Sequence, residues 1–280
     1  MKIKILSDST CDLPRELAEK YDITLLPLSV IKDGERFIDG ITITPAEIFK
    51  HVANGGSLCS TAARNVEDYR QDFAKYTADY DGIVCINIGS NFSSCYQNAT
   101  IASMDFPNVV TVDSMNLSTG QGRITLRAAE LADSCTDLSA LRSELEEFAK
   151  HVEISFLLNR LDYMVKGGRC SSATALGANL LHLRPCIEVK DGKMTVVKKY
   201  RGSYDKCLKN YIQDRLEGRD NLWTDMMFLT WTEISDLCLN TVRDAIQEYG
   251  HFETVQEGLA GCTISCHCGP DTLGIVVVRK

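Results

Sequence analysis

The sequence predicts an α/β protein of two domains, in which a mostly parallel sheet covered by helices precedes an α+β domain. The chain has 280 residues, which is more than one typical domain needs. Its first half alternates short apolar runs with amphipathic segments, the pattern of strands joined by helices. Its second half interrupts this alternation with a strong hairpin signal at Asp191-Gly192. We place the domains at 1–152 and 153–280.

Short runs rich in β-branched residues mark the strands of the first half. The turn Asp33-Gly34 separates the second of these strands from the third. The predicted strands are 3–6, 23–31, 36–38, 83–88 and 109–112. Among the helices, the one at Pro45 has the clearest start, because Thr44 and Glu47 form a capping box. The predicted helices are 12–21, 45–53, 65–80, 94–104, 117–132 and 138–150, and Asp12 is expected to cap the first.

The second half contains fewer and more scattered elements. The hairpin at Asp191-Gly192 joins predicted strands 185–189 and 194–198. Further strands are predicted at 154–157, 226–230 and 274–279, and helices at 204–216 and 235–249. The cluster Lys198, Lys199 and Arg201 is either a basic binding patch or the exposed edge of the hairpin.

Composition excludes several classes of protein. The net charge of −8 argues against binding nucleic acid or anionic membranes, which requires a basic surface. The first six residues are too few and too charged for a secretory signal, and no apolar run reaches membrane-spanning length. We therefore expect a cytoplasmic protein without stable membrane insertion. In that reducing compartment the 12 cysteines are expected to be free thiols in the core.

Hydroxyl side chains recur where predicted strands end and helices begin. They lie in Ser7-Asp8-Ser9-Thr10, Cys59-Ser60-Thr61, Ser90-Asn91-Phe92-Ser93-Ser94 and Asp113-Ser114. Ligands of open α/β sheets collect at the carboxyl ends of the strands, where helix N-termini favour an anion. Each hydroxyl alone is better explained as a helix cap, so it is their recurrence that indicates a site for an anionic group.

Standard nucleotide and hydrolase motifs are absent from the sequence. No Walker phosphate loop and no Gly-x-Ser-x-Gly elbow occurs. Gly120-Gln121-Gly122 lacks the third glycine of a dinucleotide fingerprint and falls inside a predicted helix. These observations argue against nucleotide binding through a standard motif.

Two further stretches are ambiguous. Cys262, Cys266, His267 and Cys268 include zinc-ligand types, but neighbours along a strand point to opposite faces, so we expect no metal. In Lys166-Gly167-Gly168-Arg169, paired glycines and an arginine suit a carboxylate or phosphate, or else a plain helix end.

The order of these stretches resembles the DegV family over essentially the whole chain, about residues 3–279. The resemblance covers the opening Ser7-Asp8-Ser9-Thr10 followed by Asp12-Leu13-Pro14, the segment around Thr61, the segment from Ser90 to Gln97, Asp113-Ser114, Lys166-Gly167-Gly168-Arg169, Tyr200-Arg201-Gly202 and His267 with Gly269-Pro270. The chain departs from the family pattern at Ser94, which replaces the usual glycine, and at Ala62-Ala63-Arg64.

The resemblance implies a carrier that holds one long-chain fatty acid in an apolar tunnel and needs no other cofactor. Thr61 and Ser93 would bind the carboxylate at the domain junction, with Ser94, Arg169 and His267 near that headgroup. In fatty acid kinase systems of this family the carrier presents the carboxylate to a separate catalytic subunit. The resemblance therefore implies such a kinase as the protein partner.

Two rival functions remain open from the residues. A serine-dependent acyl hydrolase or transferase could use one of the serines with His267, although such catalysis needs an oriented base that the sequence does not reveal. A zinc or redox module could use the cysteines, although no Cys-x-x-Cys pair is present.

Overall fold

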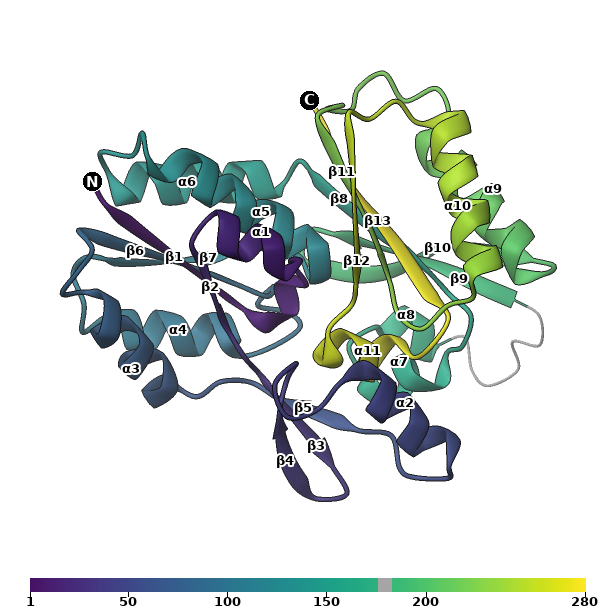
Figure 1. Ribbon diagram of the computed structural model, residues 1–280, viewed down its shortest axis with the longest axis horizontal. Coiled ribbons are helices and arrows are strands. Elements are labelled where there is room, and N and C mark those ends of the chain that lie inside the picture. Colours follow the sequence, from purple (N-terminus) through teal and green to yellow (C-terminus); the bar gives the residue numbers. More distant parts are fainter. Residues whose placement is uncertain (176–182) are drawn as a thin grey trace.

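The computed structural model describes residues 1–175 and 183–280, and its first sheet consists of four parallel strands in the order β2-β1-β6-β7. The strands are β1 (Ile3–Asp8), β2 (Ile23–Leu26), β6 (Gly82–Asn87) and β7 (Val109–Asp113). One face carries α3 (Val66–Tyr76) and α4 (Cys95–Ser103), and the other carries α1 (Arg15–Lys20), α5 (Ser118–Ala132) and α6 (Leu138–Ala149) (Figure 1). This half matches the expected parallel sheet covered by helices.

The second half forms a six-stranded sheet in the order β10-β9-β8-β13-β11-β12. Its pairs are antiparallel except for β11 with β12. The strands are β8 (Val152–Leu158), β9 (Leu183–Lys190), β10 (Lys193–Arg201), β11 (Met226–Trp231), β12 (Thr254–Leu259) and β13 (Thr272–Val278). Helices α9 (Tyr204–Leu216) and α10 (Asp236–Tyr249) cover its outer face, and α5 lies between the two sheets (Figure 1). The α/β class with a mixed second sheet is therefore confirmed.

A third, small sheet connects the two halves. It comprises β3 (Ser29–Lys32), β4 (Glu35–Ile38) and β5 (Ser60–Ala62), and α2 (Pro45–Ala53) follows β4. Its buried Val30 packs in one cluster with Phe49 of α2, Tyr163 of α7 (Asp162–Gly167) and Cys266 of α11 (Cys262–Cys268). A segment of the first half thus shares a core with the second half, and the division at residue 152 stays a prediction.

Two sequence predictions are wrong because of tertiary context. The expected strand 23–31 is split into β2 and β3, which belong to different sheets, with Pro27 between them. Proline has no N–H to continue a ladder, so the chain can leave one sheet there. Asp12 does not cap α1, whose N-cap is Pro14. Instead its carboxylate receives the backbone N–H of Gly261 at 2.9 Å.

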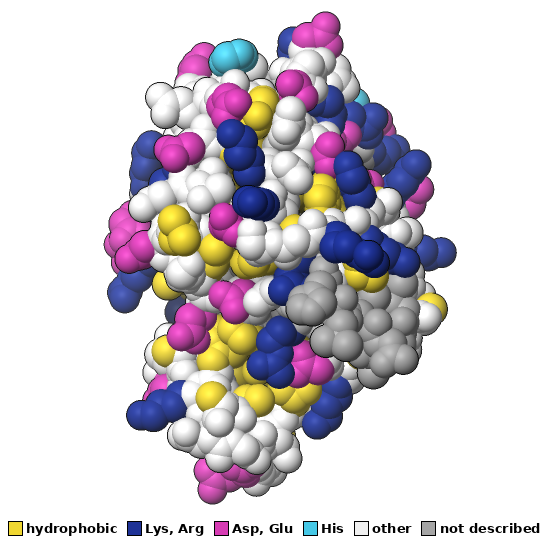
Figure 2. Space-filling model, turned by 90° about the vertical axis from the view of Figure 1, so that its right-hand side faces the viewer, with side chains coloured by type: hydrophobic (Ala, Val, Ile, Leu, Met, Phe, Trp, Pro, Cys, Tyr) yellow, Lys and Arg dark blue, Asp and Glu magenta, His cyan; other side chains and the backbone are white. Residues whose placement is uncertain are grey.

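The basic cluster of β10 lies on the edge of the six-stranded sheet. Lys198, Lys199 and Arg201 are exposed, and Lys198 forms a 2.5 Å ion pair with Asp214. On the face shown in Figure 2, lysine and arginine side chains alternate with acidic ones. The cluster therefore lies on the exposed edge of the hairpin, as the second explanation expected, and a role in binding stays untested by its position. Within residues 1–175 and 183–280, no helix has the length and apolarity needed to cross a membrane.

Candidate functional site

A cavity of about 150 Å³ lies where strands of the small sheet and of the six-stranded sheet, and the loop after β6, meet α11. It brings together every residue that the sequence predicted for the headgroup: Thr61, Ser93, Ser94, Arg169 and His267. The rest of its described lining is mostly apolar and comprises Leu28, Ala63, Ile88, Phe92, Leu117, Phe156, Met164, Met194, Thr263, Ile264 and Cys268. The cavity therefore combines the predicted headgroup residues with a mostly apolar lining, and the contact of these side chains with a ligand stays a prediction.

Thr61 and His267 form a direct pair although 206 residues separate them in sequence. Thr61 lies on β5, and its Oγ1 is 2.9 Å from Nε2 of His267 on α11. Nδ1 of His267 has no hydrogen-bond partner among the described residues. We assign the proton to Nε2, since the other tautomer would bury an unpaired N–H. Thr61 then accepts from His267, and its own hydroxyl proton is free to donate into the cavity.

The imidazole of His267 is electrically neutral at pH 7. Burial, and then the nearby Arg169 guanidinium, lowers the pKa of His267 to about 4. Arg169 itself is exposed at the edge of the cavity, where its Nη1 donates to the carbonyl of Gly167 at 2.6 Å. The positive charge at this site therefore comes from Arg169, while His267 acts as a neutral donor.

Ser93 and Ser94 stand at the start of α4, in the loop that follows β6. The Oγ of Ser93 accepts the backbone N–H of Cys95 at 3.3 Å, and Ser94 is the N-cap residue. The loop is anchored by Asp8, which accepts the N–H of Ile88 at 2.9 Å. The positive end of the α4 dipole therefore faces the same cavity as Thr61 and favours a negative group there.

Other strand-end hydroxyls do not reach the cavity and satisfy buried groups instead. Ser9 donates to Asp39 at 3.0 Å and accepts the N–H of Leu28 at 3.1 Å. Thr10 donates to Gln121 at 2.8 Å or to Asp8, and Ser114 donates to the carbonyl of Asn116 at 3.1 Å. These residues are not the helix caps that the alternative explanation expected, but their donors are used in hydrogen bonds within the protein.

The apolar lining extends beyond the main cavity. A second cavity of about 30 Å³ shares Leu117, Phe156, Ile264 and Cys268 with it. The sequence did not identify these lining residues, because apolar side chains that line a tunnel look like core. A dry apolar cavity of about 150 Å³ is large enough for benzene. A long acyl chain therefore requires the walls to move, and the flexible Met164 and Met194 suit such a wall.

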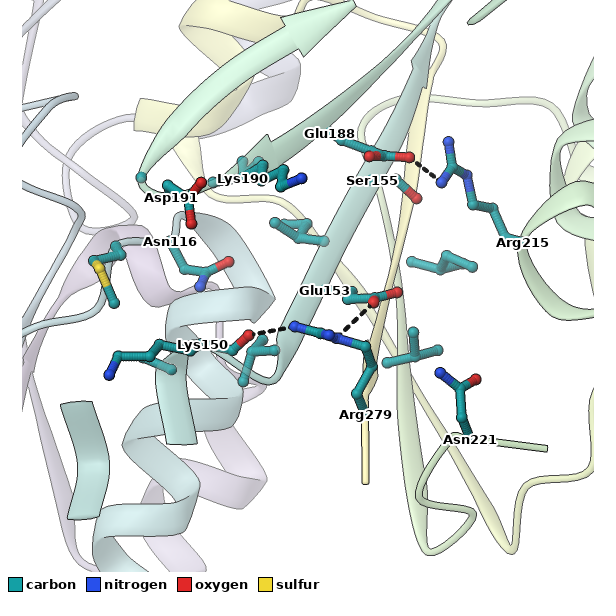
Figure 3. Close-up of a pocket in the computed structure, with 18 of the residues that line it drawn as sticks. Asn116, Lys150, Glu153, Ser155, Glu188, Lys190, Asp191, Arg215, Asn221 and Arg279 are labelled. Atoms are coloured by element: carbon teal, nitrogen blue, oxygen red, sulfur yellow. Dashed lines mark hydrogen bonds and ion pairs between the residues drawn. The ribbon is translucent and has the colours of Figure 1, made fainter. Parts of the chain in front are cut away.

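A larger cavity of about 630 Å³ lies beside the start of β8 and has a charged lining (Figure 3). There Arg279 pairs with Glu153 at 2.9 Å, and Arg215 pairs with Glu188. Lys190 and Asp191 at the tip of the β9–β10 hairpin complete one wall (Figure 3). An acyl chain buried among these ions would displace water from them and offer no hydrogen bonds in its place, which costs free energy. The smaller cavity is therefore the better candidate for an apolar ligand.

The cysteine-rich stretch is a helix and not the strand that the sequence argument assumed. Cys262, Cys266 and Cys268 are buried on α11, and burial raises the pKa of Cys268 to about 12. All 12 cysteines are buried, as expected of small core hydrophobes. The geometrical reason given for the absence of zinc is therefore wrong, and the absence of zinc stays a prediction.

Comparisons with known proteins agree with this architecture. The sequence model of the family described as "Uncharacterised protein, DegV family" matches residues 2–280. A Thermotoga maritima protein described as a fatty acid-binding protein is 32% identical over 298 residues and aligns over 100% of both chains. The structure described as fatty acid binding of a DegV family protein from Thermus thermophilus matches with a TM-score of 0.90 at 27% identity over 100% of both chains. A stearic acid-binding protein from Eubacterium ventriosum matches with a TM-score of 0.82 at 26% identity, over 99% of this chain and 98% of its own.

Proposed function

The chain belongs to the DegV family, and from this premise we propose that it binds one long-chain fatty acid in the cavity lined by Thr61, Ser93 and His267. One observation carries the proposal: a cavity with a mostly apolar lining also contains hydroxyl side chains, a helix N-terminus and an arginine. A fatty acid has the matching distribution of charge and apolar surface. Relatives described as fatty acid-binding proteins support the same assignment.

The carboxylate is proposed to bind the hydroxyls of Thr61 and Ser93. Because the Nε2–H of His267 donates to Oγ1 of Thr61, the hydroxyl proton of Thr61 is free to donate to a ligand. Hydrogen bonds to a carboxylate are charge-assisted and contribute roughly 1.5–3 kcal/mol each. Arg169 adds a long-range attraction at the edge of the cavity. These groups fix the orientation of the ligand.

The acyl chain is proposed to follow the apolar lining from Ile88 and Phe92 toward Phe156 and Ile264. Each buried methylene contributes roughly 0.8 kcal/mol, so the chain supplies most of the affinity. Because the described cavity is smaller than such a chain, binding is expected to open its walls. The carrier would then present the carboxylate of the bound fatty acid to a fatty acid kinase subunit, which would phosphorylate it.

A hydrolase is the second candidate, because the 2.9 Å contact between Thr61 and His267 has the form of a nucleophile and a base. Two features weigh against it. Nδ1 of His267 lacks an orienting carboxylate among the described residues, and a pKa of about 4 makes the imidazole a poor base at neutral pH. A carrier needs neither an orienting carboxylate nor a basic imidazole.

The proposal is tested by lipid extraction and titration. Protein produced in bacteria is expected to contain about one fatty acid per chain, seen by native mass spectrometry, and to take up added palmitate or oleate. The double variant Thr61→Val/Ser93→Ala is expected to bind palmitate at least about a hundredfold more weakly, since two charge-assisted bonds are lost while the apolar lining remains.

Ser60→Ala provides the matched control, because Ser60 is an exposed neighbour of Thr61 outside the lining. Its affinity should equal that of the parent protein. Unchanged affinity in the double variant would remove the proposed headgroup site. Turnover of an acyl ester that disappears in the Ser93→Ala or Thr61→Val protein would favour the hydrolase.

A further inference from the structure

We infer that Asp12 and Asp39 are positioning residues that hold the first turn of α11 against the first half of the chain and thereby set the cavity wall. Neither lines the cavity, and nothing in the family comparison assigns them a role. The inference rests on the proposed function for the identity of the ligand. The part of the inference that concerns the position of α11 can be tested without a ligand.

The first turn of α11 has no cap of its own. Its N-cap residue is Gly261, which has no side chain to offer. The N–H of Gly261 donates to Oδ1 of Asp12 at 2.9 Å, and the N–H of Cys262 donates to Oδ1 of Asp39 at 2.9 Å. The N–H of Thr263 donates to Oδ2 of Asp39 at 3.2 Å. Residues more than 200 positions earlier in the chain therefore satisfy the orphan donors of this helix.

Both carboxylates are built into the protein interior. Asp12 is 8% exposed and Asp39 is 5% exposed. Asp39 also accepts the hydroxyls of Thr263 at 2.7 Å and Ser9 at 3.0 Å. Asp12 lies 2.6 Å from the hydroxyl of Ser118, and both residues have left-handed backbones, with φ of 47° and 48°. This conformation is uncommon for non-glycine residues, and aspartate tolerates it better than serine, so the contact is held at a conformational cost that falls mainly on Ser118.

The start of α11 determines where its cavity-facing side chains lie. Thr263, Ile264, His267 and Cys268 all line the cavity. Thr263 and His267 are one turn apart on the same side of the helix, and Asp39 binds Thr263 directly. A shift of the first turn would therefore move His267 away from Thr61 and change both the headgroup site and the apolar wall.

Substitution by asparagine distinguishes the two aspartates. Asp39 receives a backbone N–H on each oxygen, so an amide at this position confronts one N–H with its own NH₂ group in either orientation. Asp12 receives a backbone N–H on Oδ1 only, and its Oδ2 meets a hydroxyl that can donate or accept. The Asp12→Asn variant can therefore retain both contacts. Burial, with the nearby carboxylates of Asp39 and Asp8 acting in the same direction, raises the pKa of Asp12 to about 8, which agrees with a neutral side chain here.

Asp39→Asn, Asp12→Ala and Asp12→Asn test the inference in the full-length protein. Palmitate affinity is measured by calorimetry, and the titration midpoint of His267 is followed by NMR in lipid-free protein. Asp39→Asn and Asp12→Ala are expected to weaken palmitate binding about tenfold and to move the His267 midpoint upward toward its ordinary value. Asp12→Asn is expected to retain the parent affinity within about threefold.

Asp22→Asn is the control for general destabilisation. Asp22 pairs at 2.6 Å with Lys4, whose side chain is 4% exposed, so this variant should lower Tm without moving either readout. If Asp39→Asn lowers Tm but leaves palmitate affinity and the His267 midpoint unchanged, the inference is overturned. Equal losses in Asp12→Asn and Asp12→Ala would also overturn it. If Asp39→Asn does not fold, the comparison of Asp12→Asn with Asp12→Ala decides the question alone. A parent protein that binds no palmitate refutes the proposed function, while the His267 titration still tests the positioning role.

Discussion

At the scale of single residues, the site depends on how three polar side chains divide their tasks. His267 is neutral and donates to Thr61, Thr61 is left free to donate to a ligand, and Arg169 carries the charge. A buried cation beside the headgroup would bind a carboxylate more strongly. Its desolvation would, however, destabilise the ligand-free protein. The observed arrangement keeps the charge exposed and places only neutral donors in the interior.

Arg169→Ala is expected to separate binding from presentation. Because Arg169 is exposed and its visible hydrogen bond is to Gly167, its removal should change fatty acid affinity by less than about threefold. Phosphorylation by a partner kinase should fall much further, because Arg169 lies at the exposed edge of the cavity, on the side proposed to face the kinase. Lys166→Ala, which removes an exposed cation outside the lining, is the control. An affinity loss as large as that of the Thr61/Ser93 double variant would place Arg169 among the anchors instead.

The pH behaviour of His267 provides a second prediction. Its folded pKa of about 4 lies below the ordinary value of 6.5, so at intermediate pH the unfolded chain binds a proton that the folded chain does not. This residue therefore contributes a loss of stability, at most about 3 kcal/mol, as the pH falls from 6.5 to 4. Asp12, with its raised pKa, contributes a gain of stability as the pH falls over that range. The overall stability therefore does not isolate His267, and the titration of His267 itself must be measured.

The measurement is an NMR titration of lipid-free protein, with His267→Gln used to assign the resonance. A midpoint near 4 is expected. Palmitate should raise that midpoint, because a nearby carboxylate favours the imidazolium. A midpoint close to the ordinary value in lipid-free protein would show that the ring is solvated and not held against Thr61.

At the scale of elements, α11 is the part of the structure on which the site depends most. It contacts α7, α2 and the small sheet, and it contributes four side chains to the cavity. Gly167 at the end of α7 allows the close approach, because a Cβ there would lie 2.5 Å from Nδ1 of His267. Of the paired glycines in the sequence motif, Gly167 therefore serves helix packing, while Gly168 is the left-handed C-cap that ends α7.

Gly167→Ala should push the imidazole away from Thr61. The new methyl group cannot fit without movement of His267 or of the backbone, so we expect palmitate affinity to fall about tenfold. Gly258→Ala is the control, since its added Cβ would meet only Pro14 at 3.5 Å. Calorimetry on both lipid-free proteins makes the comparison. Parent-like affinity in Gly167→Ala would mean that the position of His267 is not set by this contact.

The elements that the sequence predicted best are those whose signals are local. The capping box at Thr44 and the hairpin at Asp191-Gly192 depend only on neighbouring residues, and both occur as expected. The helix α11 was missed because glycines flank it and its polar start is capped by distant aspartates. The five headgroup candidates came from the order of the family motifs, whereas the roles of Asp12 and Asp39 depend on contacts between distant segments.

At the scale of the whole molecule, the candidate site is a junction. Thr61 and Ser93 come from the first half of the chain, and Arg169 and His267 come from the second. Helix α5 is buried between the two large sheets, where its Thr119 bonds Thr230 of β11 at 2.7 Å. A ligand in this cavity would contact both halves at once, so its binding should be coupled to the stability of the entire fold.

Removal of the bound lipid is therefore expected to lower Tm in a single cooperative transition. A ligand at about a hundredfold excess over its Kd stabilises the folded state by about 2.7 kcal/mol, which corresponds to roughly 5–10 °C for a protein of this size. Calorimetry should show one transition that returns to the higher temperature when palmitate is added back. The Thr61→Val/Ser93→Ala protein serves as the control, because the same palmitate concentration should raise its Tm much less. Two transitions, of which palmitate moves only one, would mean that the ligand contacts one half of the chain and that the junction is not its site.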